Sequence, residues 1–101
     1  MLLYNITFKV DPSIFAGWLT WMQAKYIPGI QGCGCFLRCQ LLRLLDVDDS
    51  DGPTFALQCY AADRAAYEHY QETCAIPEHR EITRLWGAHC LNFRTLMEVV
   101  Q

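Results

Sequence analysis

The chain has 101 residues, 52% of them hydrophobic, and its 8 Lys and Arg against 11 Asp and Glu give a formal net charge of −3. This apolar fraction excludes a disordered chain, and mild acidity without a basic cluster argues against nucleic acid and anionic membranes as partners. The longest stretch without a charged residue, residues 12–24, is shorter than the roughly 20 residues that cross a bilayer. We therefore expect residues 1–101 to form a single domain with one hydrophobic core.

The first predicted elements are a strand and a helix. Residues 2–10 alternate between apolar and polar side chains, which predicts a half-buried strand. The Asp11-Pro12-Ser13 segment then supplies an N-cap and a first-turn proline for a helix with apolar residues at helical spacing. This helix is expected to end near Pro28, because proline disfavours helical backbone in the residue before it.

Two strands joined by an acidic loop are predicted next. The second strand covers about residues 35–45, with Leu37 on the inner face and Phe36 on the outer face. Residues 46–53 carry four Asp, a Gly and a Pro, which is typical of a solvated hairpin loop. The third strand, residues 54–61, again alternates, with its Phe, Leu and Cys residues on the inner face.

The last predicted elements are a second helix and a fourth strand. Asp63 is expected to cap the helix, Pro77 to break or kink it, and Gly87 to end it. The fourth strand covers about residues 89–99, and its alternation is interpreted with Phe93 on the inner face.

The order β-α-β-β-α-β predicts an α+β, ferredoxin-like fold, with a four-stranded antiparallel sheet and two helices on one face. From right-handed crossovers we expect the first and third strands to be central neighbours running parallel, with the second and fourth at the edges. Both helices then cover the sheet face that bears Tyr4, Phe8, Leu57 and Phe93.

The other sheet face is predicted to mix apolar side chains with amides and arginines. A solvated face carries more Lys and Glu, whereas this mixture suits two sheets packed against each other in a homodimer; a plain solvated face is the alternative. The polar members are the candidate ligand-binding or dimer-face residues: Asn5, Thr7, Arg38, Gln40, Gln58, Tyr60, Asn92 and Arg94.

The cysteines and the N-terminal residues bear on the cellular compartment. Lys9 and Asp11 interrupt the N-terminal apolar residues too early for a secretory signal, so a cytoplasmic protein is expected. In a reducing cytoplasm the six Cys are expected to be free thiols that act as small hydrophobic residues.

Several segments resemble a known family. They are Tyr4-Asn5-Ile6-Thr7, Asp11-Pro12-Ser13-Ile14, Trp18-Leu19 with Trp21-Met22, Ile27-Pro28, Gly34-Cys35-Phe36, Arg43-Leu44-Leu45 and Phe93-Arg94-Thr95-Leu96. Together they resemble the small bacterial family catalogued as domain of unknown function 4286, over nearly the whole chain. The resemblance implies a dimeric α+β barrel, a fold whose members include small-molecule monooxygenases and ligand-binding proteins. Relatives often carry His before the Ile-Pro pair, where this chain has Tyr26.

Cysteines and acidic residues form two weak candidates for metal sites. Cys33, Cys35 and Cys39 could offer three thiolates to a soft metal, but the paired spacing of structural zinc sites is missing. The acidic stretch 46–52 lacks the Gly and Glu positions of a calcium-binding loop and is interpreted as a solvated turn.

Histidines and aromatic residues offer no assignable catalytic group. His69, His79 and His89 are spaced ten residues apart, which fits no ligand pattern on a helix. His69 and His79 are expected to be exposed or capping residues, and a general base that lines a pocket is the alternative for either of them. The helices carry many large side chains, of which most are expected in the core and some at a pocket or interface: Trp18, Trp21, Met22, Tyr26, Tyr67, Tyr70 and Trp86.

The sequence thus predicts the fold in more detail than the function. The first hypothesis is a non-catalytic, dimeric module that binds a small ligand or a partner protein, with no cofactor and no catalytic residue assigned. A second is a cofactor-independent enzyme, of the monooxygenase or isomerase type, acting on an aromatic or polyketide-like molecule. A third is a thiol-based metal binder. The expected partners are a second copy of the chain and a small aromatic molecule.

Overall fold

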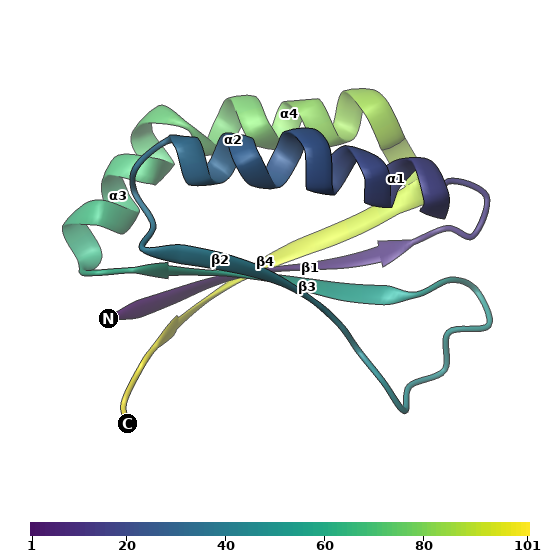
Figure 1. The fold of residues 1–101 in the computed structure, drawn as a ribbon, viewed down its shortest axis with the longest axis horizontal. Coiled ribbons are helices and arrows are strands. Elements are labelled where there is room, and N and C mark those ends of the chain that lie inside the picture. The colour runs from purple at the N-terminus through teal and green to yellow at the C-terminus, as the bar shows by residue number, and fades with distance from the viewer.

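Four strands form one antiparallel sheet in the computed structural model, which describes every residue from 1 to 101 (Figure 1). The strand order is β2-β3-β1-β4, and every neighbouring pair is antiparallel. The fold is therefore ferredoxin-like, and β2 and β4 lie at the edges as predicted. The strand bounds are Leu2–Val10 for β1, Arg38–Arg43 for β2, Thr54–Ala61 for β3 and Cys90–Glu98 for β4.

The prediction that the two central strands are parallel is wrong, because β1 pairs with β3 in antiparallel register. A helical crossover joins β1 to β2 and preserves strand direction, whereas the following hairpin reverses it. One reversal between β1 and β3 leaves them antiparallel, so a right-handed crossover alone does not make them parallel.

The first helical segment is longer than predicted. It consists of α1 (Phe15–Trp21), a π-helical turn η1 (Met22–Tyr26) and α2 (Ile27–Gly32), without a break between them. The predicted end near Pro28 is wrong, since the backbone stays helical through it. Pro28 directly follows the wide π turn, in which the Ile27 N–H reaches five residues back to the Met22 carbonyl. The wider turn accommodates a proline ring that a regular α-helix would exclude.

The start of this segment also differs from the prediction. The Asp11 carboxylate accepts hydrogen bonds from the N–H and the hydroxyl of Ser13, at 2.9 and 2.8 Å. It thereby closes a turn, and the regular helix begins only at Phe15, after Ile14.

The second helical layer consists of α3 (Arg64–Thr73) and α4 (Ala75–Trp86), followed by a short 3₁₀ turn, η2 (Gly87–His89). The Asp63 cap is confirmed, since its carboxylate accepts from the Ala66 N–H at 2.9 Å. The break lies at Cys74 and not at Pro77, which sits in the first turn of α4, where a missing N–H breaks no helical hydrogen bond. Gly87 ends α4 with a φ of 53°, as predicted.

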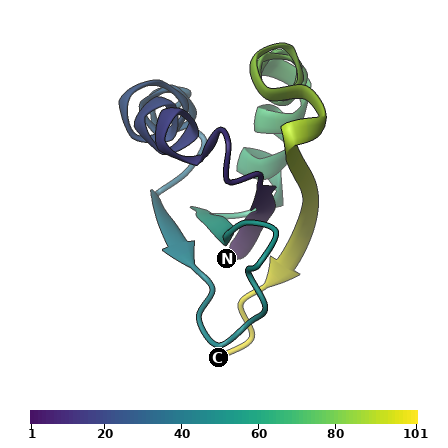
Figure 2. The ribbon, with the colours of Figure 1, turned by 90° about the vertical axis from the view of Figure 1, so that its right-hand side faces the viewer.

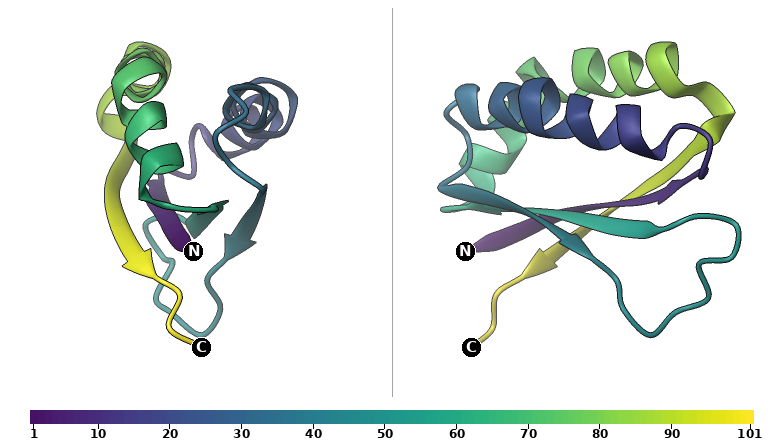
Figure 3. Two further views of the ribbon diagram at one scale, coloured as in Figure 1. Left: turned by 90° about the vertical axis from the view of Figure 1, so that its left-hand side faces the viewer. Right: turned by 45° about the vertical axis from the view of Figure 1, so that its right-hand side comes forward.

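The helices lie on one side of the sheet, and the other side is left open. Viewed end-on, the first helical segment and the α3–α4 layer lie side by side above the sheet, and the edge strands β2 and β4 run downward from the helices on either side of the central strands (Figure 2). The β2–β3 loop and the C-terminal residues project on the side opposite the helices (Figure 3). None of the helices has the length and hydrophobicity needed to span a bilayer.

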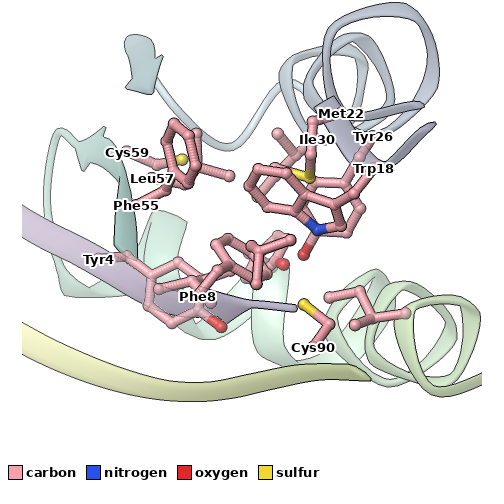
Figure 4. Close-up of a cluster of buried hydrophobic side chains, with 14 of the residues drawn as sticks. Tyr4, Phe8, Trp18, Met22, Tyr26, Ile30, Phe55, Leu57, Cys59 and Cys90 are labelled. Carbon is pink, nitrogen blue, oxygen red and sulfur yellow. The ribbon is translucent and has the colours of Figure 1, made fainter. Parts of the chain in front are cut away.

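The core lies between the helices and the sheet (Figure 4). The predicted inner faces of β1 and β3 are confirmed, since Phe8, Leu57 and Cys59 are fully buried there. The helices contribute the other large buried side chains, which are Trp18, Met22, Tyr26, Ile30, Tyr70 and Ile82.

The predicted faces of β4 are exchanged in the structure. Thr7 pairs with Phe93 and Ile6 pairs with Arg94, so Phe93 lies on the open face and is 62% exposed. Asn92 and Arg94, predicted on the open face, point toward the helices instead. A shift of one residue in register moves every side chain of a strand to the other face. The more apolar side of β4 faces away from the helices, and the polar Asn92 and Arg94 occupy the side that faces them.

A similar exchange occurs at the start of β2, which begins at Arg38 and not at residue 35. Phe36, predicted on the outer face, packs against Tyr4 and Tyr70 with ring centroids 6.0 and 4.8 Å apart. Leu37, predicted on the inner face, is 63% exposed. These residues precede the strand, so strand alternation does not govern them.

Candidate functional site

Six of the eight predicted site residues share the open face of the sheet. Cross-strand pairing places Asn5 beside Gln58 and Gln58 beside Gln40, a row of amides across three strands. The Arg38 guanidinium lies over the Tyr60 ring, 4.5 Å from its centroid. The six residues are Asn5, Thr7, Arg38, Gln40, Gln58 and Tyr60.

Exposed apolar side chains surround this amide row. Their exposed fractions range from 38% to 64%, and the largest side chain among them is Phe93; they are Leu42, Leu91, Phe93 and Met97. Asn5 is itself buried and donates to the Thr7 hydroxyl at 3.0 Å, but its Oδ1 atom accepts no hydrogen bond. A buried acceptor without a partner is costly, so the unpaired Asn5 oxygen is an unusual feature of this face.

A cleft of about 400 Å³ lies between the two helical layers. Trp21 and Tyr26 form its aromatic wall, with ring centroids 5.2 Å apart. We call it the interhelix cleft; its residues are Trp21, Lys25, Tyr26, Gly29, Glu78, Glu81 and Leu85. Its volume and aromatic wall suit a small, flat ligand.

Glu78 is the chemically distinctive group of the interhelix cleft. Its Oε2 atom accepts a hydrogen bond from the Tyr70 hydroxyl at 2.5 Å. Partial burial raises the pKa of the Glu78 carboxyl, and this outweighs the Tyr70 hydrogen bond and the positive charge of Arg94, which both lower it. A carboxyl with a raised pKa can accept and release a proton closer to neutral pH.

Tyr26 also lines this cleft, and its hydroxyl is buried and unpaired. Tyr26 is 5% exposed, and its hydroxyl oxygen has no hydrogen-bond partner. Burial raises the pKa of Tyr26, and the nearby negative charge of Glu78 adds to the effect. Its hydroxyl therefore stays protonated and can donate a hydrogen bond to a ligand oxygen.

The other two predicted residues lie on the helix-facing side of β4, which corrects their assignment to the open face. The Asn92 side chain donates to the Cys90 carbonyl at 3.1 Å, and Arg94 donates to the Asn92 side-chain oxygen at 2.9 Å. Asn92 thus positions Arg94, whose guanidinium lines a second pocket on the outer side of α4.

The three thiols considered as metal ligands do not converge. Cys33 donates to the Ile30 carbonyl and Cys35 to the Cys33 carbonyl, while Cys39 pairs with Cys59 across β2 and β3. No three His, Cys, Asp or Glu side chains come together as a group that could hold a metal ion. All six cysteines are free thiols.

The three histidines lie in different surroundings. His69 is exposed on α3, and His89 lies 3.5 Å from the Asp11 carboxylate at the surface. His79 lines the pocket that contains Arg94, and His89 lines a smaller surface pocket together with Lys9, Asp11 and Asp51. Of the two histidines for which a pocket position was the predicted alternative, His69 and His79, only His79 occupies one.

Glu78 was not identified from the sequence. A signal was present, because Glu78 shares one helical face with Ile82 and Leu85 at spacings of four and seven residues. A carboxylate in an apolar stripe is unusual, yet the stripe by itself does not reveal that Tyr70 and Tyr26 lie beside it.

Sequence comparison then places the chain in a family. The family model described as domain of unknown function (DUF4286) matches residues 1–100. The chain belongs to the DUF4286 family. No curated protein matches it significantly.

Solved structures with the same fold come from several functional groups. An antibiotic biosynthesis monooxygenase has a TM-score of 0.71 and 21% identity, with 100% of both chains covered. SnoaB, a cofactor-independent oxygenase from Streptomyces nogalater, has a TM-score of 0.66 and 18% identity over 99% of this chain and 93% of that chain. A dimeric ferredoxin-like protein from an uncultured marine organism has a TM-score of 0.65 and 12% identity over 99% and 95%. At these identities the likeness shows the fold alone.

Proposed function

We propose that this DUF4286 protein is a cytoplasmic bacterial homodimer that binds a small aromatic molecule in the interhelix cleft of each protomer. The observation that carries the proposal is the aromatic wall of Trp21 and Tyr26 around a cavity of about 400 Å³. The six free thiols support a reducing compartment.

The dimer forms through the open face of the sheet. Phe93 and its apolar neighbours are too exposed for a face that meets only water, and the amide row beside them suits a partly polar interface. A second sheet supplies a donor for the unpaired Asn5 oxygen and covers Phe93. One solved structure with this fold is described as a dimeric ferredoxin-like protein, which is consistent with this mode of assembly.

The ligand of the interhelix cleft is a flat molecule with at least one oxygen. Trp21 offers a partly exposed ring face for stacking, and the neighbouring Tyr26 has a buried hydroxyl that no protein group uses. The Arg84 guanidinium donates to both carboxylate oxygens of Glu81, at 2.6 and 3.1 Å, so the negative charge of Glu81 is largely compensated. A neutral aromatic alcohol therefore fits the cleft better than a cation.

Two glycines of α2 provide a matched test of this site. A Cβ atom added at Gly29 or at Gly32 meets no atom within 4 Å, but only Gly29 lines the cleft. Gly29→Leu should fill the cleft and weaken the binding of 1-naphthol, followed by tryptophan fluorescence, by about tenfold or more. Gly32→Leu should bind as the wild type does. Equal affinities for the two variants would contradict the proposed site.

A second candidate function is favoured by Glu78. A carboxyl with a raised pKa in a ligand cleft can act as a general base that removes a proton from a bound aromatic alcohol or a carbon acid. In an isomerisation the proton returns to another carbon. In an oxygenation at a CH₂ group, dioxygen supplies one oxygen atom to form C=O and the other leaves as water with the two hydrogens. A monooxygenase and a cofactor-independent oxygenase share this fold, which makes both reactions worth testing.

Glu78→Gln separates binding from catalysis. The variant keeps a side-chain oxygen that can accept from Tyr70 but cannot remove a proton. If the protein is an enzyme, turnover of a deprotonatable aromatic substrate, measured by oxygen uptake or product analysis, should fall by about 100-fold or more while 1-naphthol still binds. Equal turnover in wild type and variant would contradict the role of Glu78.

A further inference from the structure

A second pocket, of about 300 Å³, lies on the side of α4 away from the interhelix cleft. We call it the arginine pocket, since Arg94 from β4 and Arg80 from α4 both line it. Its other polar residues are Tyr4 from β1, Gln71 from α3 and His79 from α4. Four elements that are distant in sequence therefore bring five polar side chains to one cavity.

The two arginines are not paired with any carboxylate. Neither forms an ion pair, and the pocket lining contains no Asp or Glu. Arg94 is half-buried, and its one side-chain hydrogen bond goes to Asn92, which is neutral. The Glu78 carboxyl is close enough to be affected by the charge of Arg94 but forms no ion pair with it, and a partly buried guanidinium outside an ion pair favours the entry of an anion.

Tyr4 provides a second, independent indication of a ligand. The Tyr4 side chain is 2% exposed, and its hydroxyl oxygen has no hydrogen-bond partner. Burial raises the pKa of Tyr4, while the charge of Arg94 and the adjacent donor groups of Arg94 and Gln71 act against the rise. The hydroxyl is therefore protonated at neutral pH and free to donate to an oxygen atom that sits beside Arg94.

His79 and Gln71 complete a lining of hydrogen-bond donors. Partial burial lowers the pKa of His79, and the charge of Arg94 lowers it further, so the imidazole is neutral at pH 7 and still carries one N–H. The Gln71 amide offers two more N–H groups. An oxyanion is the ligand group that uses all of these donors at once.

We propose that the arginine pocket binds the oxyanion of a small organic acid, either a carboxylate or a phosphate monoester. The arginines provide charge and planar donor pairs, Tyr4 donates from the base of the pocket, and Asn92 orients Arg94. This site is separate from the interhelix cleft and does not depend on what the cleft binds.

The test is a titration of the purified protein, followed by backbone amide NMR, with benzoate, phenyl phosphate and the neutral analogue benzamide. At least one of the two anions should bind to saturation with one molecule per protomer, and benzamide should bind at least about tenfold more weakly. The tighter of the two anions identifies the source of the oxyanion, and either result supports the proposal.

Variants of three arginines complete the test. Arg94→Gln and Arg80→Gln should each weaken anion binding by about tenfold, whereas Arg64→Gln, at the exposed start of α3, should not change it. Arg80 is exposed on α4, so its variant decides the matter if Arg94→Gln does not fold. The proposal is overturned if neither anion saturates the protein, if benzamide binds as tightly as the anions, or if Arg64→Gln weakens binding as much as Arg80→Gln does.

Discussion

Phe8 and Phe93 lie on opposite faces of one sheet, on neighbouring strands and one pairing position apart, yet their surroundings differ completely. Phe8 is fully buried and contacts the Trp18 ring at a centroid distance of 5.4 Å, whereas Phe93 is 62% exposed. Both faces contain aromatic and aliphatic side chains, but only one is covered by helices (Figure 2). The covered face supplies the hydrophobic core, and the open face leaves its apolar side chains exposed, which supports the proposed dimer.

The largest expected effect is on the covered face. Phe8→Ala should lower the free energy of unfolding by about 3–5 kcal/mol, since it removes a fully buried ring from between Trp18 and Tyr26. Urea denaturation at fixed protein concentration measures the change. A loss below about 1 kcal/mol would mean that this face is not the core.

The corresponding change on the open face should act on assembly. Phe93→Ala should destabilise the protomer by less than about 1 kcal/mol but raise the dimer dissociation constant by about tenfold or more. Analytical ultracentrifugation measures the dissociation constant. Ile76→Ala is the matched control, because Ile76 is 61% exposed on the helix-covered side. A wild-type protein that is monomeric at high concentration would refute the sheet-to-sheet dimer.

A smaller effect distinguishes two carboxylates on α4. Burial raises the pKa of Glu78, so the folded protein binds more protons than the unfolded chain between pH 4.5 and the raised value. Glu78 therefore makes stability fall as the pH rises through this range. The pKa of Glu81 is lowered by its hydrogen bond from Arg84, so its contribution is present at higher pH and is lost as the pH falls.

Glu78→Gln and Glu81→Gln should accordingly show opposite pH trends. Relative to wild type, the unfolding free energy of Glu78→Gln should rise with pH, and that of Glu81→Gln should fall. Urea denaturation between pH 4 and pH 8, at one protein concentration, measures both trends. If the unfolding free energies of the two variants changed with pH in the same direction, Glu78 would be no more desolvated than Glu81.

Much of the candidate site lay beyond prediction from the sequence. The amides and Arg38 were assigned correctly to the open face, because their strands contain clear alternation of apolar and polar residues. Arg94 was assigned to the wrong face, since β4 is apolar on the side that the helices do not cover. Glu78 was missed because its importance comes from Tyr70 and Tyr26, which no spacing rule connects to it.

The sequence by itself determined the order and type of the elements, since strand alternation, the Asp63 cap and the Gly87 stop are local signals carried by a few consecutive residues. Only the tertiary structure decided that β1 and β3 are antiparallel, that Phe93 faces away from the helices, and that two pockets flank α4. These features depend on strand register and on the distance between the two helical layers. Both are set by contacts between residues that lie tens of positions apart, which no local pattern specifies.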